Sequence, residues 1–415
     1  MSMYDVAVIG GGASGLAAAL GAAEQAKRQG RALKIALLEK NPRVGKKLLM
    51  TGNGRCNLTN THAAPEHYHG DTERAAEILR RFSPEKIISV FRSRGLLCRE
   101  LEEGRVYPYS LQASSVLNIL RRGADAAGVE TVCEFPVQRI ENIPGGFAVL
   151  SGKDAVRSRK VILAVGGKAC PQSGSEGDGY DLLKPFRHTT AALRPALVQI
   201  RTDAKLTRPL KGVRCPAETT LLSRGKPVRF TRGEVQFTEN ALSGICIFEL
   251  SRYAGDPAAK PMEIEIDLAP DHEEDELARL FCAQAEHPGD LTAAQLVEGI
   301  LPKALAAEVV KTALGSASVS VATLTADNLR LVAGVIKKMR FPVLGTLSWQ
   351  NAQVTAGGVP LAETDTDLQS RFCRGLYLCG ELLNVDGDCG GYNLHWAWAS
   401  GITAGAAAAE SLLKG

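Results

Sequence analysis

A glycine-rich turn near the N-terminus constrains the fold of this chain more than any other feature. The stretch YDVAVIGGGASGLAAALGAAEQA predicts a strand over residues 5–9, a tight turn and a helix of small residues. The turn fits the pattern G-x-G-x-x-G as Gly10, Gly12 and Gly15. These glycines allow the bend, the approach of a pyrophosphate to the backbone, and close packing of the helix on the sheet. The segment therefore predicts a dinucleotide-binding βαβ unit.

An acidic residue at the end of the next predicted strand supports this interpretation. The strand LKIALLEK leads to Glu39, 24 residues after Gly15, close to the spacing of about 20 expected for the acid that bonds the ribose hydroxyls. An acid rather than a base at this position disfavours a 2′-phosphate on the ribose. The alternative is a generic parallel βαβ unit that binds nothing.

The C-terminal region carries a second set of ligand-binding signals. A predicted strand over 375–379 is followed by Gly380 and Glu381, then by a polar loop and a helix from about Asn393. Glu381 can bond a ribityl hydroxyl. The free N–H groups at the start of the helix can face the electron-rich N1/O2 edge of an isoalloxazine ring. These signals suit a ligand longer than the near half of NAD.

A third segment, RKVILAVGGKACPQSGSEGDG, predicts a strand that ends near Ala164 and Gly166, where glycine again lets the adenosine side approach closely. No second G-x-G-x-x-G follows a predicted strand, so we expect no separate nicotinamide-nucleotide domain. Together the three segments favour FAD over NAD as the cofactor. NAD(P)H is expected only as a transient electron donor.

Composition disfavours several classes of function. The 49 basic and 45 acidic residues leave a net charge of +4, too mild to predict a nucleic-acid or membrane partner. The 10 cysteines include no C-x-x-C pair, which argues against a zinc ribbon or a disulfide framework and fits a reducing cytosol. No apolar run reaches the ~18 residues of a spanning helix. We expect a cytoplasmic protein with a small-molecule substrate, and its oligomeric state is left open.

Periodicity divides the chain into three predicted parts. Residues 1–190 and 355–415 alternate strands and helices and form the expected FAD-binding domain. Short extended runs over 191–270 and 341–354 predict a small antiparallel β domain. Residues 271–340 predict a helical subdomain. Its three helical stretches are 273–286, 292–314 and 325–339.

Across these segments the chain resembles the YhiN/BaiN-type flavoproteins, also called the aminoacetone-oxidase family of FAD-binding enzymes. The similar stretches extend from residue 5 to about residue 405. They are DVAVIGGGASGLAAA, GKKLLMTGNGRCNLTN, GRVYPYSLQASSVLNIL, LAVGGKACPQSGSEGDGY, TAGGV and GLYLCGELLNVDGDCGGYNLHWAWASG. GNGRCNLTN and DGDCGGYNL are far more specific than the glycine fingerprint.

The resemblance implies an α/β fold with an FAD-binding Rossmann-like domain of the glutathione-reductase type. An inserted β-barrel-like subdomain and a helical subdomain would interrupt this domain. Some members of the family are linked to reduction of an unsaturated steroid ring and others to amine oxidation, so no single substrate is implied. The chain departs from the family pattern at His395, where glutamine is usual, and at Glu239-Asn240, where a histidine–aromatic pair is common.

Candidate cofactor contacts lie at the glycine turn, the strand ends, the loop TGNGRCNLTN and the start of the last helix. They are Gly10, Gly12, Ala13, Ser14, Gly15, Glu39, Lys40, Lys47, Asn53, Gly54, Arg55, Cys56, Asn57, Val137, Ala164, Gly166, Gly380, Glu381, Gly391, Asn393 and Leu394. Arg55 either contacts an anionic flavin or a substrate carbonyl, or holds its loop by hydrogen bonds. Cys56 is either a redox thiol or a packed small residue, and we favour packing because no partner cysteine is nearby.

The predicted catalytic residues are Arg55, Tyr392 and His395. Tyr392 and His395 lie beside the proposed flavin edge and are candidates for proton transfer. The alternative for His395 is a histidine bonded to backbone at the helix start. The histidines of THAAPEHYHG suggest a metal site, but we predict a surface loop and no metal. We predict that Asp386 and Asp388 are turn residues. We predict that Trp396 and Trp398 lie in the core.

The sequence thus predicts an FAD-dependent oxidoreductase in which flavin N5 gives or takes a hydride. Reduction of an activated C=C bond in an enone or steroid-like substrate is favoured over oxidation of an amine. Two further alternatives are a flavin-dependent RNA-modifying enzyme, which the mild net charge disfavours, and a flavin-bound sensor without turnover.

Overall fold

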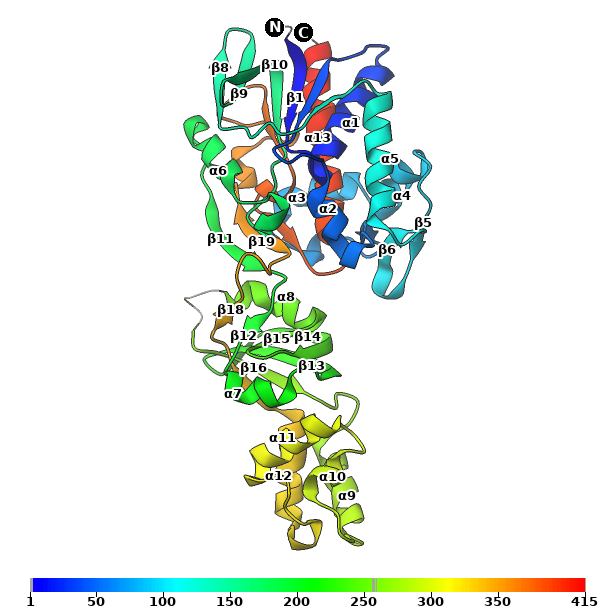
Figure 1. Cartoon of the computed structure of the whole chain (residues 1–415), viewed down its shortest axis with the longest axis vertical. Helices are drawn as coiled ribbons and strands as arrows, with labels where there is room; N and C mark the ends of the chain where they lie inside the picture. Colours follow the sequence, from blue (N-terminus) through cyan, green and yellow to red (C-terminus); the bar gives the residue numbers. More distant parts are fainter. Residues whose placement is uncertain (1–2, 256–257, 259, 415) are drawn as a thin grey trace. The chain divides into compact units, whose positions relative to one another are not determined.

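The computed structural model describes residues 3–255, 258 and 260–414. They form two units, one of residues 1–194 with 353–415 and one of residues 195–352 (Figure 1). The sequence analysis places the corresponding boundaries at 190/191 and 354/355. The β and helical parts of the insertion, which the sequence analysis separates, belong to one unit here.

A mixed sheet with a parallel centre organises the first unit. Its parallel strands run in the order β7–β2–β1–β10–β20, and β9 and β8 extend it antiparallel to the first half of β10. All four residues of β2 are buried, as expected where helices cover both faces of a parallel sheet. The strands are β1 (Tyr4–Ile9), β2 (Ile35–Leu38), β7 (Glu130–Val132), β8 (Arg139–Ile143), β9 (Gly146–Ser151), β10 (Asp154–Leu163) and β20 (Leu376–Leu378).

Two helices of small residues, α1 (Ala13–Arg28) and α13 (Tyr392–Leu413), pack closely on each other (Figure 1). A Cβ atom added to Gly401 would lie 2.4 Å from the Ser14 carbonyl oxygen, and one added to Gly405 would lie 2.0 Å from that of Ala18. Because the residue numbers of the contacting pairs increase together along both helices, the two helices run in the same direction. Only glycine allows this approach.

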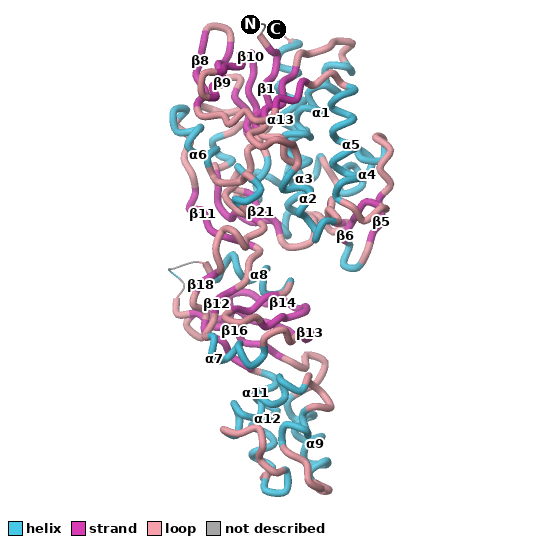
Figure 2. Tube along the Cα trace, viewed as in Figure 1, coloured by secondary structure: helices cyan, strands magenta, loops and turns pink. Residues whose placement is uncertain are grey.

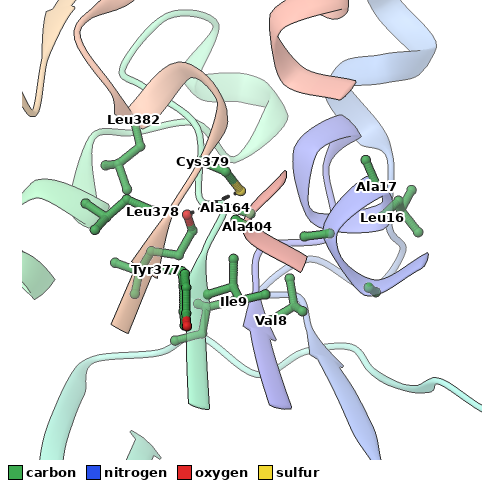
Figure 3. Close-up of a cluster of buried hydrophobic side chains, with 14 of the residues drawn as sticks. Val8, Ile9, Leu16, Ala17, Ala164, Tyr377, Leu378, Cys379, Leu382 and Ala404 are labelled. Carbon is green, nitrogen blue, oxygen red and sulfur yellow. Dashed lines mark hydrogen bonds between the residues drawn. The ribbon is translucent and has the colours of Figure 1, made fainter. Parts of the chain in front are cut away.

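The core of the first unit lies where these helices meet the sheet. Figure 3 shows Val8 and Ile9 of β1 beside Leu16 of α1 and Leu378 of β20, all of them buried. In α13, Trp396 and Trp398 are almost fully buried, in agreement with the core role predicted for them. Their ring N–H groups donate to backbone carbonyls, at 3.1 Å and 2.9 Å respectively.

Smaller elements surround this core. Ser83 and Pro84 start α4, where the Ser83 hydroxyl accepts the Lys86 N–H. The helices are α2 (Lys46–Met50), α3 (Thr72–Arg81), α4 (Pro84–Arg92), α5 (Ala113–Ala126) and α6 (Asp178–Leu183). The strands are β3 (Thr59–Asn60), β5 (Cys98–Glu100) and β6 (Arg105–Pro108) in one sheet, β4 (Tyr68–Gly70) with β21 (Val385–Gly387), and β11 (Ala191–Ala196) with β19 (Val354–Gly358).

The sheet of the second unit curls until its two edges meet. Its order is β17–β16–β13–β14–β15–β12–β18. The two edge strands, β17 (Met339–Pro342) and β18 (Gly345–Thr346), are separated by only two residues of chain. Seven flat strands would span about 29 Å, whereas this link reaches about 11 Å at most, so the sheet is barrel-like. The other strands are β12 (Ile200–Arg201), β13 (Arg214–Ser223), β14 (Lys226–Phe237), β15 (Ala241–Ser243) and β16 (Met262–Asp267).

The helical part of this unit differs from the prediction at one place. The stretch 292–314, predicted as one helical segment, forms two helices because Pro302 interrupts the backbone hydrogen bonding and starts the second one. Residues of the barrel-like sheet and of these helices share one buried cluster. The helices, of which Figure 2 labels all except α10, are α7 (Ala204–Thr207), α8 (Ile245–Ala254), α9 (Glu274–Ala285), α10 (Ala293–Val297), α11 (Lys303–Leu314) and α12 (Ala326–Lys337).

The glycine contacts between α1 and α13 lead to a stability prediction. Gly405→Ala should lower the free energy of unfolding by about 1–3 kcal/mol, because its Cβ would meet the backbone of Ala18 and Ala22. Gly123→Ala in α5 is the control, since its nearest neighbour is the flexible end of Leu20 at 3.3 Å. Denaturant unfolding followed by circular dichroism measures both. Equal effects of the two changes would contradict the prediction.

Candidate functional site

The carboxyl ends of the central parallel strands bring most predicted cofactor residues to one edge of the sheet. The backbone connects these ends directly: Gly10 N–H donates to Leu38 at 2.7 Å, and Ala164 N–H donates to Ile9 at 2.8 Å. Crevices at this edge are where open α/β sheets bind ligands. The predicted residues found here are Gly10, Gly12, Ala13, Ser14, Gly15, Glu39, Lys40, Ala164, Gly166, Gly380 and Glu381.

The glycine turn forms a cradle in front of α1. A Cβ on Gly10 would lie 2.5 Å from the Ala164 carbonyl oxygen, and one on Gly15 would lie 1.8 Å from that of Gly10. A Cβ on Gly12 would meet nothing within 4 Å. Gly12 begins α1 without a side-chain cap, so no cap side chain accepts the N–H groups of the first turn. This is the geometry of a phosphate site at a helix N-terminus.

Glu39 is held rigidly beside this turn. Its Oε2 accepts the Gly11 N–H at 2.8 Å, and its Oε1 accepts the backbone and side-chain N–H groups of Asn41 at 2.8 and 2.7 Å. A carboxylate has about four acceptor positions, so one position on Oε2 stays available for a hydroxyl. The Phe135 N–H donates to the Glu39 carbonyl oxygen at 2.9 Å, which brings the half-buried Val137 loop to the same end.

The two predicted lysines are engaged in ion pairs. Lys40 Nζ lies 2.8 Å from both Glu176 and Asp178. Lys47 Nζ lies 2.7 Å from Glu381. Their predicted contacts with the cofactor stay predictions, but neither ammonium is left uncompensated in this structure.

The loop TGNGRCNLTN bends through left-handed backbone. Gly52, Asn53 and Gly54 have φ values of 57°, 54° and 81°, and the segment from Gly52 to Arg55 is exposed. Cys56 is fully buried instead, and burial raises the pKa of its thiol to about 12. The thiol therefore stays protonated, which suits a packing role rather than a redox role.

A buried acceptor without a partner lies beside the start of α13. The side-chain oxygen Oδ1 of Asn57 is buried and has no hydrogen-bond partner among the described residues. It lies 2.8 Å from the position that a Cβ on Gly391 would occupy. Gly391 precedes α13 in left-handed conformation and offers no side-chain cap. The first-turn amides, which include those of Asn393 and Leu394, therefore lack helical acceptors.

These groups match one edge of an isoalloxazine ring. The helix amides are donors suited to its C2 carbonyl oxygen, and Asn57 Oδ1 is an acceptor suited to its N3–H. The Asn393 side chain does not compete for the ring, because it bonds both backbone groups of Gly387, at 2.9 and 2.8 Å. The residues present thus fit a flavin at this end and a pyrophosphate at the glycine turn.

His395 lies in the core, away from any surface. Its side chain is 0% exposed, and Nδ1 lies 2.7 Å from the Thr59 hydroxyl oxygen. Burial lowers the pKa of the ring to about 4, although the Phe82 carbonyl and the Glu85 carboxylate act in the opposite direction. A fully buried neutral ring cannot exchange protons with a substrate unless the core opens. The geometry therefore argues against the predicted proton-transfer role of His395.

Sequence reasoning missed a cluster at the ends of the paired strands β4 and β21. The sequence predicts a surface loop for His67 and His69 and a turn for Asp388, but in the structure both histidines are hydrogen-bonded to Asp388. His67 Nδ1 lies 3.2 Å and His69 Nε2 lies 2.8 Å from the buried Asp388 carboxylate. Asp386, likewise expected in a turn, is buried within β21. No local signal in the sequence reports this pairing of segments more than 300 residues apart.

The described residues lack two features. They contain no group of three or more histidine, cysteine, aspartate or glutamate side chains placed to hold a metal ion. Nor does any helix formed by these residues combine the length and apolar character needed to cross a membrane.

Comparison with known proteins identifies the class and then the family. The sequence profile of the HI0933-like protein Rossmann domain matches residues 4–407. The chain is 36% identical to the 3-dehydro-bile acid delta(4,6)-reductase of Clostridium scindens, over 98% of this chain and 100% of that protein. It is 28% identical to the ribosomal RNA dihydrouridine synthase of Haemophilus influenzae, over 96% and 97% of the two chains.

Among solved structures, the 3-ketosteroid-delta4-(5alpha)-dehydrogenase of Rhodococcus jostii RHA1 has a similar fold. The TM-score is 0.53 at 16% identity, with 98% of this chain and 97% of that chain covered. The present chain is therefore an FAD-dependent oxidoreductase with a Rossmann-type domain. It belongs to the HI0933-like family of Rossmann flavoproteins, in agreement with the YhiN/BaiN resemblance.

The buried His395 predicts a pH-dependent stability. An unfolded histidine takes up its proton near pH 6.5, whereas His395 does so in the folded protein only near pH 4. Stability is therefore lost as the pH falls from 6.5 to 4. Between pH 7 and pH 4, the free energy of unfolding of the wild type should fall by about 3 kcal/mol more than that of His395→Gln. Denaturant unfolding at three pH values tests this, with exposed His62→Gln as the control that should show no such difference.

The exposed Arg55 yields a prediction about cofactor retention. If its guanidinium contacts the flavin, Arg55→Ala should weaken FAD binding about 10- to 100-fold, the cost of losing a hydrogen bond to a charged group. Flavin content after dialysis and the reduction potential measure the effect. Arg157→Ala, a change at another exposed arginine, should alter neither quantity. Unchanged retention and potential in Arg55→Ala would assign Arg55 to the loop alone.

Proposed function

We propose that this enzyme reduces a C=C bond conjugated to a carbonyl group in a small, steroid-like substrate. The observation that carries the proposal is the end-to-end similarity to a bile-acid delta(4,6)-reductase at 36% identity. The relative at 28% identity is named for another reduction of this class, because the reduced bond of uracil is also conjugated to a carbonyl. We infer the reaction class from both relatives, and the steroid-like substrate from the first.

The residues at the sheet edge have distinct tasks in this proposal. The cradle at Gly12 and the start of α1 would hold the pyrophosphate, and Glu39 would hold the ribose of the adenosine. Asn57 and the first turn of α13 would orient the isoalloxazine. When bound and reduced, FAD supplies the hydride from N5.

Charge compensation is the second task of the site. Addition of a hydride to an enone moves negative charge to the carbonyl oxygen, and oriented donors stabilise such charge more effectively than water does. In this proposal the helix dipole of α13 and the guanidinium of Arg55 would supply the compensating positive charge. A small-molecule substrate, NAD(P)H as the electron donor and a cytoplasmic location are further parts of this proposal.

The proposal is tested by anaerobic reoxidation of the reduced protein. Photoreduced enzyme should be reoxidised by a 3-keto-Δ4 or 3-keto-Δ4,6 steroid, with formation of the ketone that has one C=C bond fewer, as followed by flavin absorbance and mass spectrometry. Parallel reactions contain a uridine-rich RNA oligonucleotide, and oxidised enzyme is mixed with primary amines. Faster reoxidation by RNA, or reduction of the oxidised flavin by an amine, would assign the corresponding alternative. Reaction with none of these compounds would overturn the proposed function.

A further inference from the structure

The cluster at the ends of β4 and β21 contains a carboxylate that bonds two histidines, His67 just before β4 and His69 within it. Asp388 Oδ2 lies 3.2 Å from His67 Nδ1, and Asp388 Oδ1 lies 2.8 Å from His69 Nε2. A carboxylate only accepts hydrogen bonds, so the proton on each neutral ring lies on the nitrogen that faces Asp388. The Asp388 N–H in turn donates to the His67 carbonyl oxygen at 2.9 Å. The carboxylate and the His67 ring are therefore fixed relative to each other.

His67 is the accessible member of this cluster. Its side chain is 34% exposed, whereas that of Asp388 is 9% exposed and that of His69 is 15% exposed. With Nδ1 bonded to Asp388, Nε2 is the nitrogen that can exchange a proton. A buried carboxylate on one ring nitrogen and a reactive site on the other is the arrangement that sets the tautomer of a catalytic histidine.

An aromatic wall fixes the plane of the imidazole. The rings of His67 and Tyr392 stack with centroids 4.6 Å apart at an angle of 21°. Tyr392 is held in turn, because the Tyr68 hydroxyl donates to its carbonyl oxygen at 3.1 Å and the Tyr68 ring meets its ring edge-on. Tyr392 is itself buried, so this geometry suits a positioning role better than the predicted transfer of its own proton.

The cluster adjoins the expected isoalloxazine site. Tyr392 is the first residue of α13, and its neighbours Asn393 and Leu394 carry the amides assigned to the ring. Asp388 lies three residues before the helix-start glycine, Gly391. Other titratable or charged residues on the elements around the histidines are Glu66, Asp386, Cys389 and Arg105.

We propose that His67 is the general acid of the reaction, with Asp388 and Tyr392 as positioning residues. This inference rests on the proposed function. A hydride adds to the β-carbon of the substrate, and the electrons of the C=C bond move toward the carbonyl. Nε2–H of the His67 imidazolium then protonates the α-carbon, and the neutral ring regains a proton from water. The substrate gains one hydride and one proton, and the reduced cofactor loses that hydride, which carries both electrons.

The test compares variants in the anaerobic reoxidation reaction. His67→Gln should slow reoxidation by the steroid enone 10²- to 10⁴-fold, the usual contribution of a general acid, while FAD content stays unchanged. The wild-type rate should fall as rising pH deprotonates the imidazolium, and His67→Gln should lose this dependence. His62→Gln is the matched control, because His62 lies in the same segment and is exposed without the carboxylate partner.

Two further variants separate proton transfer from a structural role. His67→Ala should be rescued by added imidazole, which a purely structural loss would not allow. Asp388→Asn should retain His67 and the bound FAD but slow reoxidation, because the ring loses the carboxylate that fixes its tautomer and orientation.

The outcomes distinguish this inference from the proposed function. If the enone reoxidises the wild type, and His67→Gln matches it in rate and pH profile, the inference fails while the proposed function stands. Failure of imidazole to rescue a folded, flavin-containing His67→Ala would also overturn the inference. If no enone reoxidises the wild type, the proposed function fails and the inference falls with it.

Discussion

The close packing of α1 against α13 is the contact on which the candidate site depends. Each helix begins with a glycine and without a side-chain cap, so each presents backbone donors. Gly401 packs on Ser14 near the start of α1, and α13 begins nine residues before Gly401. Because Ser14 is the second residue of α1, the starts are offset by eight residues, or about 12 Å along the helix direction at 1.5 Å per residue. A cofactor with a pyrophosphate at one end and a ring system at the other needs two such sites, and the glycine contacts set their offset.

The charges around these two helix starts are mostly compensated by protein groups. Glu39 accepts three N–H groups, Lys47 pairs with Glu381, and Lys40 pairs with two acids. What the site offers beyond these pairs are neutral backbone dipoles and the exposed Arg55. A cofactor that cycles between neutral and anionic ring forms is served by fixed dipoles, because they need not reorganise when its charge changes. The pairing thus makes the edge a polar but not a strongly charged site.

Sequence reasoning reached the parts of the site that local rules determine. The glycine turn, the acid at Glu39 and the start of α13 each lie within a single strand–turn–helix segment, whose geometry follows from glycine, burial and helix ends. The curled sheet was accessible only through the family resemblance. Its closure depends on pairing at both sides of the short link between β17 and β18, which no local pattern expresses. The break at Pro302 carried a local signal, but apolar periodicity continues across it.

The contacts formed between distant segments were out of reach for the same reason. Burial of Asp388 depends on the register of β4 against β21, and the orphan acceptor of Asn57 depends on how closely Gly391 approaches Thr59. Neither follows from residue type or spacing within one segment. A histidine in a polar stretch is more often solvated than bonded to a buried carboxylate. Without the strand pairing, the ordinary interpretation as a surface loop prevails.

Two histidines close to α13 show how burial separates roles that residue type leaves equal. His395 is fully buried and neutral, and its ring bonds the Thr59 hydroxyl. A neutral imidazole and a glutamine amide can each hydrogen-bond a hydroxyl, since each offers both a donor and an acceptor. The departure from the family pattern at His395 therefore lies in the core, at a position that bonds the Thr59 hydroxyl. His67 is partly exposed and carries a carboxylate on its inner nitrogen, which is why we propose His67 rather than His395 for proton exchange.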